Sequence, residues 1–191
     1  MRGGNRLIDC PPSPGDVNMT EDLERLYQTM YASVVRFLYR KVWDQDRAED
    51  LAQEVFIRAM NHQPEKPRAW IFAVASNLAR DEARAAVRRK KHLTLLTNDP
   101  VTLARPATGA DDVVEQEEEM AGVQTALDSL SARDREVLLL WDAGLSYQEI
   151  AQQTGLALGA VGTTLARARR RLVEAYDRNE TNETIERAAH S

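Results

Sequence analysis

Three groups of polar and charged side chains stand at spacings that suit binding surfaces. The first recurs at helical spacing between residues 46 and 57, so its members share one arc of a helix. They are Asp46, Asp50, Gln53, Glu54 and Ile57. An apolar residue within a charged surround is the composition of a protein interface. The arc therefore predicts a protein-binding surface, with a solvated acidic face as the alternative.

A second, basic group occupies residues 77–91. Six cations lie between residues 80 and 91, against two acids. Asn77, Arg80 and Arg84 share one arc, and Arg88 adds charge near its end. Such a cluster suits neutralisation of nucleic-acid phosphates. The alternative is a helix C-terminus whose cations only complement the helix dipole.

The third group belongs to a helix-turn-helix pattern. Ser131 and Ser146 are each followed three residues later by an acid, which is the capping-box pattern that opens a helix. Gly144 suits the left-handed end of the first helix, and a turn at 154–156 joins the second helix to a third. The outward side of the third helix carries Thr163, Arg167, Arg170 and Arg171. We expect these residues to contact DNA, with an arginine-rich surface helix of a non-binding bundle as the alternative.

Helices position all three groups, because apolar residues recur at helical spacing and no strand alternation appears. In the second helix the apolar stripe is Ala48, Leu51, Ala52, Val55, Phe56 and Ala59. Residues 21–43 form one long helix or two short ones, and Pro67 starts another. In the helix after the turn we expect an inner side of Leu158, Val161, Leu165, Ala168 and Leu172.

The fold class that follows is all-α, with two small helical domains joined by a flexible linker. The linker is acidic, with seven acids against one cation between residues 92 and 122, and its prolines and glycines favour an extended chain. We divide the chain into a disordered leader (1–19), a first domain (20–91), the linker (92–122), a second domain (123–176) and a tail (177–191).

Composition excludes several classes of protein. The chain has 191 residues and a net charge of -5, and no apolar run approaches the ~20 residues of a membrane span. With no secretory signal pattern, we expect a cytoplasmic protein that does not insert into membranes. Cys10 is the only cysteine, and the three histidines lie far apart, so we expect no disulfide, no metal and no cofactor. The acids lie on an outward helical face or in the linker, where they do not converge on a catalytic site, so we expect no enzyme.

Four segments carry a resemblance to a known family. They are DRAEDLAQEVF (46–56), AWIFAVASN (69–77), LSYQEIA (145–151) and ARRRL (168–172). In this order and spacing they resemble conserved regions 2 and 4 of the extracytoplasmic-function (ECF) sigma factors. The resemblance implies a bacterial transcription initiation subunit that binds core RNA polymerase and directs it to promoter DNA.

The same resemblance implies a role for each surface. The acidic arc would bind core polymerase, and the third helix of the first domain, with the loop before it, would recognise and melt the minus-10 element. The residues assigned to minus-10 DNA are Asn61, His62, Gln63, Asn77, Arg80, Arg84 and Arg88. The residues assigned to minus-35 DNA are Thr163, Arg167, Arg170 and Arg171.

The resemblance implies one further partner and a position for the linker, and one segment of the chain departs from the family pattern. Members are commonly inhibited by an anti-sigma factor, often membrane-anchored, and their linker enters the RNA path of the polymerase, although a passive tether is the alternative. This chain has Ala157, Ala160, Gly162 and Thr164 where the family usually has polar and basic residues, so we expect fewer direct minus-35 contacts. A stand-alone helix-turn-helix regulator is the competing hypothesis, and it leaves the first domain without a role.

Overall fold

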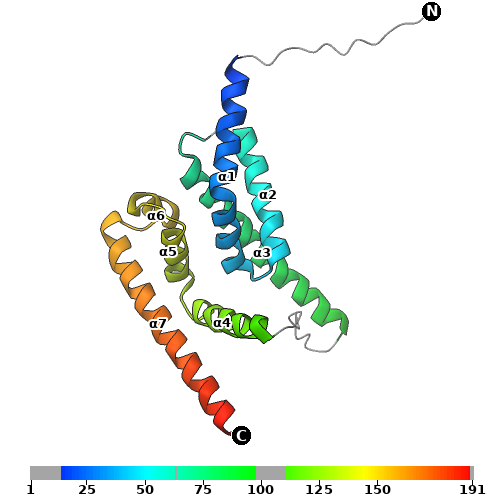
Figure 1. Cartoon of the computed structure of the whole chain (residues 1–191), viewed down its shortest axis with the longest axis vertical. Coiled ribbons are helices and arrows are strands. Elements are labelled where there is room, and N and C mark those ends of the chain that lie inside the picture. The colour runs from blue at the N-terminus through cyan, green and yellow to red at the C-terminus, as the bar shows by residue number, and fades with distance from the viewer. Residues whose placement is uncertain (1–13, 63, 98–110, 190–191) are drawn as a thin grey trace, which may run out of the picture.

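The computed structural model describes residues 14–62, 64–97 and 111–189 (Figure 1). These residues form helices and no strand, which confirms the all-α class. The helices are α1 (Pro14–Val42), α2 (Gln45–His62), α3 (Pro67–Thr97), α4 (Asp111–Asp128), α5 (Ala132–Asp142), α6 (Tyr147–Thr154) and α7 (Leu158–Ala189). The first three make an N-terminal module and the last four a C-terminal module (Figure 1).

The N-terminal module is built around the apolar stripe of α2. All six residues of that predicted stripe are buried, because their spacing places them on one face of the helix. They pack against Val34, Phe37 and Leu38 of α1 and against Ile71 and Ala75 of α3. This core holds α3 alongside α1 and α2, so the opposite sides of α2 and α3 face solvent.

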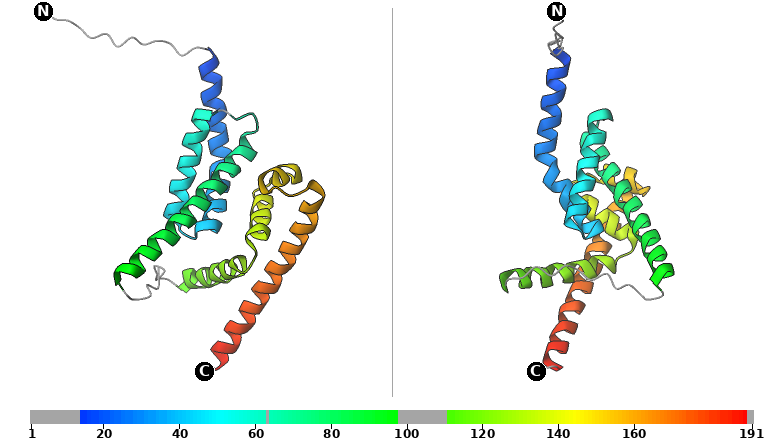
Figure 2. Two further views of the ribbon diagram at one scale, coloured as in Figure 1. Left: turned by 180° about the vertical axis from the view of Figure 1, so that it is seen from behind. Right: turned by 90° about the vertical axis from the view of Figure 1, so that its right-hand side faces the viewer.

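In the C-terminal module, the predicted helix-turn-helix is confirmed. Ser146 caps α6 with a complete capping box, in which the Glu149 side chain accepts a hydrogen bond from the Ser146 backbone. Gly144 and Gly155 adopt the left-handed conformation, with φ of 81° and 70°, which suits glycine at a helix end. The long helix α7 extends from this turn to Ala189, and α4 crosses it (Figure 2).

Some expectations about where helices begin and end, and one about a buried residue, are wrong. Residues 92–97 continue α3 and residues 111–122 belong to α4, so both ends of the predicted extended linker are helical. Residues 98–110 lie outside the described residues, as do residues 1–13 of the predicted leader, whose remainder starts α1. Leu158, expected on the inner side of α7, is 56% exposed because it stands at the first position of the helix, beyond the packed turns.

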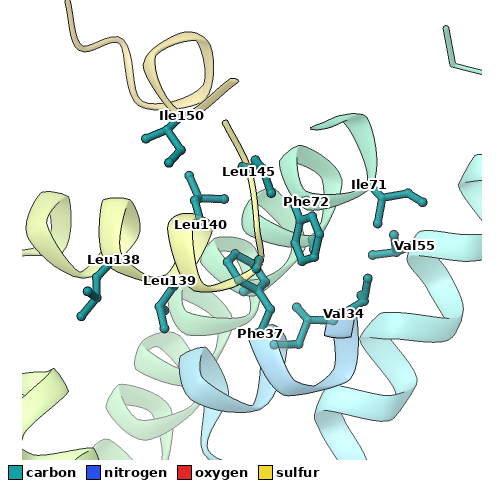
Figure 3. Packing of buried hydrophobic residues seen from close by; sticks show 14 of the residues in the cluster. Val34, Phe37, Val55, Ile71, Phe72, Leu138, Leu139, Leu140, Leu145 and Ile150 are labelled. Atoms are coloured by element: carbon teal, nitrogen blue, oxygen red, sulfur yellow. The ribbon is translucent and has the colours of Figure 1, made fainter. Parts of the chain in front are cut away.

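The two modules pack directly against each other, a contact that the sequence did not predict. Phe37 and Phe72 of the N-terminal module lie in the same buried cluster as Leu139, Leu140 and Leu145 of the C-terminal module (Figure 3). The order of the helices along the chain does not indicate that the two modules touch. The apolar residues of α5 serve both the helix-turn-helix and this junction.

Polar groups also cross the junction. Glu136 of α5 accepts hydrogen bonds from Lys41 of α1 and from Ser76 of α3, the latter over 2.8 Å. Arg68 and Gln153 each donate to a backbone carbonyl oxygen of the other module, over 2.5 and 2.7 Å. Burial lowers the pKa of the Lys41 ammonium, and Glu136 opposes that shift. The two side chains are 13% and 19% exposed, so their contact lies in a site that water reaches little.

Candidate nucleic-acid and protein interfaces

The acidic arc of α2 is exposed as predicted. Asp46, Asp50, Gln53 and Ile57 face solvent, and Glu54 is partly exposed. Within the part of the chain that the structure describes, two of the carboxylates form ion pairs, both with arginines of the same helix: Asp50 with Arg47 over 3.6 Å and Glu54 with Arg58 over 2.8 Å. Because both pairs are local and solvated, they hold the surface only weakly and leave it available to a partner.

An apolar centre larger than expected accompanies this arc. Ile57 is 53% exposed, and Met60, three residues further along α2, is also exposed. We missed Met60 in the sequence, although its spacing from Ile57 places it on an adjacent part of the same face. Two exposed apolar side chains beside carboxylates match the apolar centre and charged surround of a protein interface.

The basic face of α3 is also exposed, and its contacts are local. Arg80 donates to Asn77 over 3.0 Å, and Arg84 pairs with Asp81 over 3.2 Å. Arg88 makes no ion pair with the described residues. These side chains keep most of their hydrogen-bonding groups in solvent, where a nucleic acid could reach them.

One acid of α3 forms ion pairs with two cations near that surface. Glu82 accepts from Arg47 of α2 over 2.5 Å and from Arg89 over 2.6 Å. The hydrogen bonds from these two arginines hold the pKa of Glu82 below its usual value. Glu82 thus links α3 to α2 and forms an ion pair with Arg89 of its own helix.

The residues predicted for the loop between α2 and α3 lie in different places, and the expectation of a loop is wrong for Asn61 and His62, which form the end of α2. Asn61 donates back to the carbonyl oxygen of Ile57 over 3.1 Å. The His62 ring stacks on Trp70, with centroids 5.1 Å apart and planes inclined by 15°. Gln63 lies outside the described residues. Trp70, in the first turn of α3, also packs against the buried core, so its type and spacing alone did not indicate this contact.

On α7 the predicted residues separate into two kinds. Thr163 donates to the Ala160 carbonyl oxygen over 3.0 Å, and Arg170 makes a weak pair with Glu174 at 3.7 Å. Both are exposed and held only by their own helix. Arg167 and Arg171 instead contact a carboxylate from another element.

That carboxylate is Asp134, in the first turn of α5. Its side chain is 1% exposed, and its two oxygens accept from different arginines, Oδ1 from Arg167 over 2.9 Å and Oδ2 from Arg171 over 2.7 Å. Burial alone raises the pKa of Asp134, but hydrogen bonds from Arg167, Ser131 and Arg171 outweigh it, so the pKa lies below the usual value. Asp134 is therefore a buried anion facing two half-exposed cations.

This arrangement corrects the prediction of a capping box at Ser131. The Ser131 hydroxyl accepts from the Asp134 backbone as predicted, but the reciprocal bond to the Ser131 backbone is absent among the described contacts. The Asp134 carboxylate is turned toward α7, where two guanidinium groups attract it more strongly than one amide would.

Neither a metal site nor a membrane-spanning helix is found among the described residues. No group of three or more histidine, cysteine, aspartate or glutamate side chains within the described residues is arranged to hold a metal ion. Within the same residues, no helix is both long and apolar enough to cross a membrane.

Comparison with known proteins places these surfaces in a family. The profile of Sigma-70 region 2 matches residues 26–89, and that of Sigma-70, region 4 matches residues 121–172. The chain is 31% identical over 179 residues to the ECF RNA polymerase sigma factor SigE of Mycolicibacterium smegmatis, covering 91% of this chain and 68% of that one. The chain belongs to the ECF sigma factors. It is also 34% identical to SigL of Mycobacterium tuberculosis, over 78% of this chain and 86% of that one.

Solved structures show the same fold. The sigma factor RpoE of Bartonella quintana, in complex with the anti-sigma factor NepR, matches with a TM-score of 0.61 and 24% identity, over 82% of this chain and 98% of that one. CnrH, in complex with the cytosolic domain of CnrY, matches with a TM-score of 0.60 and 22% identity, over 83% of this chain and 89% of that one. In this ECF sigma factor the acidic arc and the basic face of α3 fall in region 2, and the arginines of α7 in region 4.

Proposed function

We propose that this ECF sigma factor binds core RNA polymerase through the acidic arc of α2. The observation that carries the proposal is that this arc is solvent-exposed, locally paired and centred on exposed Ile57 and Met60. A partner that covers it gains apolar burial at little cost in broken contacts. Its own surface should carry apolar side chains ringed by cations.

The basic face of α3 would then contact the minus-10 element. Its arginines suit phosphates, whereas the Asn77 amide can recognise the edge of a base. His62 stacked on Trp70 offers an aromatic surface beside this face, and aromatic surfaces receive unstacked bases in single-stranded nucleic acid. These features support recognition of the displaced strand during melting.

Region 4 would contact the minus-35 element through Thr163, Arg167, Arg170 and Arg171. The geometry of the helix-turn-helix supports this role, since its third helix presents these four side chains on the exposed side. The net charge of -5 gives little long-range attraction for DNA, so the polymerase should supply most of the affinity.

We also infer an anti-sigma partner and a cytoplasmic, non-enzymatic role. The structural match to RpoE bound to NepR supports such a partner, which would cover exposed apolar residues such as Ile57. We infer from the family resemblance that this partner is membrane-anchored.

The double variant Asp50→Arg with Glu54→Arg tests the polymerase surface. We expect an unchanged helical signal and loss of co-purification with core polymerase, since like charges across an interface cost several kcal/mol. Glu24→Arg with Asp177→Arg changes the charge equally at exposed sites on α1 and α7, outside the acidic arc, and should bind core normally. Wild-type binding by the α2 variant would refute the assignment.

A gel shift separates the proposal from a stand-alone regulator. A sigma factor of this kind should shift promoter DNA only when core polymerase is present. A regulator of the helix-turn-helix class would bind the same DNA alone, at a similar salt concentration.

A further inference from the structure

Asp134 occupies an unusual place among the acids of region 4. It is the buried one, and each of its oxygens accepts from a different arginine of α7. Arg167 and Arg171 are 44% and 51% exposed, so each guanidinium reaches from the buried carboxylate into solvent. A guanidinium has five N–H donors, and the bond to Asp134 uses only some of them.

The contact restricts two side chains that would otherwise be mobile. A free arginine side chain samples many rotamers, and ordering it on binding costs free energy. Here the far end of each chain is fixed by a carboxylate from α5, a different element, so the two heads stand together before any ligand arrives. Because both side chains are about half exposed, an anionic group in solvent could reach their remaining donors.

We propose that Asp134 is a positioning residue that pre-orders Arg167 and Arg171 for contact with phosphates of promoter DNA. This inference rests on the proposed function of region 4 and deepens it. Asp134 itself is buried and does not touch DNA. It acts through the two arginines, so its effect requires them.

Simple electrostatics makes the opposite prediction, which allows a sharp test. Removing a negative charge near phosphates should strengthen DNA binding if charge alone matters. Asp134→Asn keeps the size of the side chain but removes its charge, so positioning predicts weaker binding. Glu174→Gln is the matched control, since it also removes one carboxylate beside an α7 arginine, but at an exposed site.

The experiment uses holoenzyme assembled from the full chain and a bacterial core polymerase. The probes are a duplex selected from a random library by the wild-type holoenzyme, and the same duplex with its upstream half replaced. On the selected duplex we expect Arg167→Ala to lose about tenfold in affinity and Asp134→Asn about fivefold. Glu174→Gln should bind as the wild type does. Adding Asp134→Asn to Arg167→Ala should lower the affinity by less than a further factor of about two, because one of the two arginines through which Asp134 acts is already absent.

The binding measurements distinguish the positioning role of Asp134 from the proposed contact of region 4 with DNA. If Arg167→Ala weakens binding but Asp134→Asn leaves it unchanged or strengthens it, the positioning role is wrong and the proposed function stands. If neither Arg167→Ala nor Arg171→Ala affects binding to the upstream half, the assignment of region 4 to that element is wrong, and positioning falls with it.

A measurement on the wild-type chain covers the case in which Asp134→Asn fails to fold. Side-chain nitrogen NMR reports how freely each guanidinium rotates. We expect slow rotation for Arg167 and Arg171 and fast rotation for Arg170, whose partner is exposed. Equal rates for all three would overturn the proposal.

Discussion

The basic surfaces of α3 and α7 use arginine in opposite ways. On α3 the contacts of Arg80 and Arg84 come from residues three positions away on the same helix. On α7 the contact of Arg167 and Arg171 comes from Asp134, more than thirty positions earlier in the chain and buried. A local pair in water stabilises little, whereas a pair with a buried charge ties the arginine to the fold. The α3 surface should therefore adapt to its ligand, and the α7 surface should be pre-formed.

The largest expected effect comes from removing the cations around the buried carboxylate. Arg167→Ala with Arg171→Ala leaves Asp134 buried without a counter-charge, and we expect a loss of about 3 kcal/mol in the free energy of unfolding. Arg80→Ala with Arg84→Ala removes the same charge from α3 and should cost less than about 0.5 kcal/mol. Urea unfolding at neutral pH measures both. Equal losses would abolish the distinction between the two surfaces.

The pH dependence of these variants should also differ. In the wild type the pKa of Asp134 is lowered, so its stabilising contribution is present above the unfolded-state pKa and is lost as pH falls through the lower folded value. Without Arg167 and Arg171, burial raises that pKa, and protonation favours the folded state. Lowering the pH from 7 toward 4 should therefore recover stability in the double variant relative to the wild type. A constant difference between them over this range would contradict the buried-charge explanation.

The second effect concerns another pair formed across elements, Lys41 with Glu136 at the junction of the modules. Lys41→Met should cost about 2 kcal/mol, because Glu136 keeps only the Ser76 hydroxyl in a largely buried site. Arg58→Ala, which breaks the local pair with Glu54 on α2, is the control and should cost about 0.3 kcal/mol. Thermal melting of the full chain compares the two. A Lys41 variant as stable as the control would show that this ion pair does not stabilise the junction.

A third, smaller effect compares the two serine caps. Ser131→Ala and Ser146→Ala each remove a bond to a backbone amide and should each cost about 1 kcal/mol. Glu149→Ala should add a further loss at α6, since Glu149 bonds back to the Ser146 backbone. At α5 the corresponding acid serves α7, so its removal should free the α7 arginines without fraying α5. Hydrogen exchange of the first-turn amides of α5 and α6 measures the difference.

The smallest effects on stability should come from variants of the exposed face of α3, and these variants test how that face recognises DNA. Asn77→Ala should leave the fold unchanged and alter sequence preference within the minus-10 element, with little change in salt dependence. Arg84→Ala should weaken open-complex formation on all promoters about uniformly and reduce the salt slope by about one. Abortive initiation assays on a set of minus-10 variants distinguish these outcomes. A uniform loss for Asn77→Ala would mean that it does not recognise a base.

Local patterns in the sequence determined most of the helices, though not the helical ends of the expected leader and linker. They also determined the stripe that α2 buries, the complete cap at Ser146 and the left-handed ends at Gly144 and Gly155. Each depends on residues within one or two helical turns, so spacing alone carries the information. The sequence also placed the acidic arc and the basic face of α3 correctly in solvent, because exposure follows from the opposite, buried side of the same helix.

Only the tertiary structure decided which partner each charge would take when several were within reach. Asp134 stands at a capping position but pairs with α7, and Glu136 of the same helix pairs with Lys41 of the other module. These choices depend on how α5 packs between α7 and α1, which is set by the joint burial of residues from both modules. Each carboxylate pairs with the cation that tertiary packing places near it. The distance between two such groups cannot be read from their spacing along the chain.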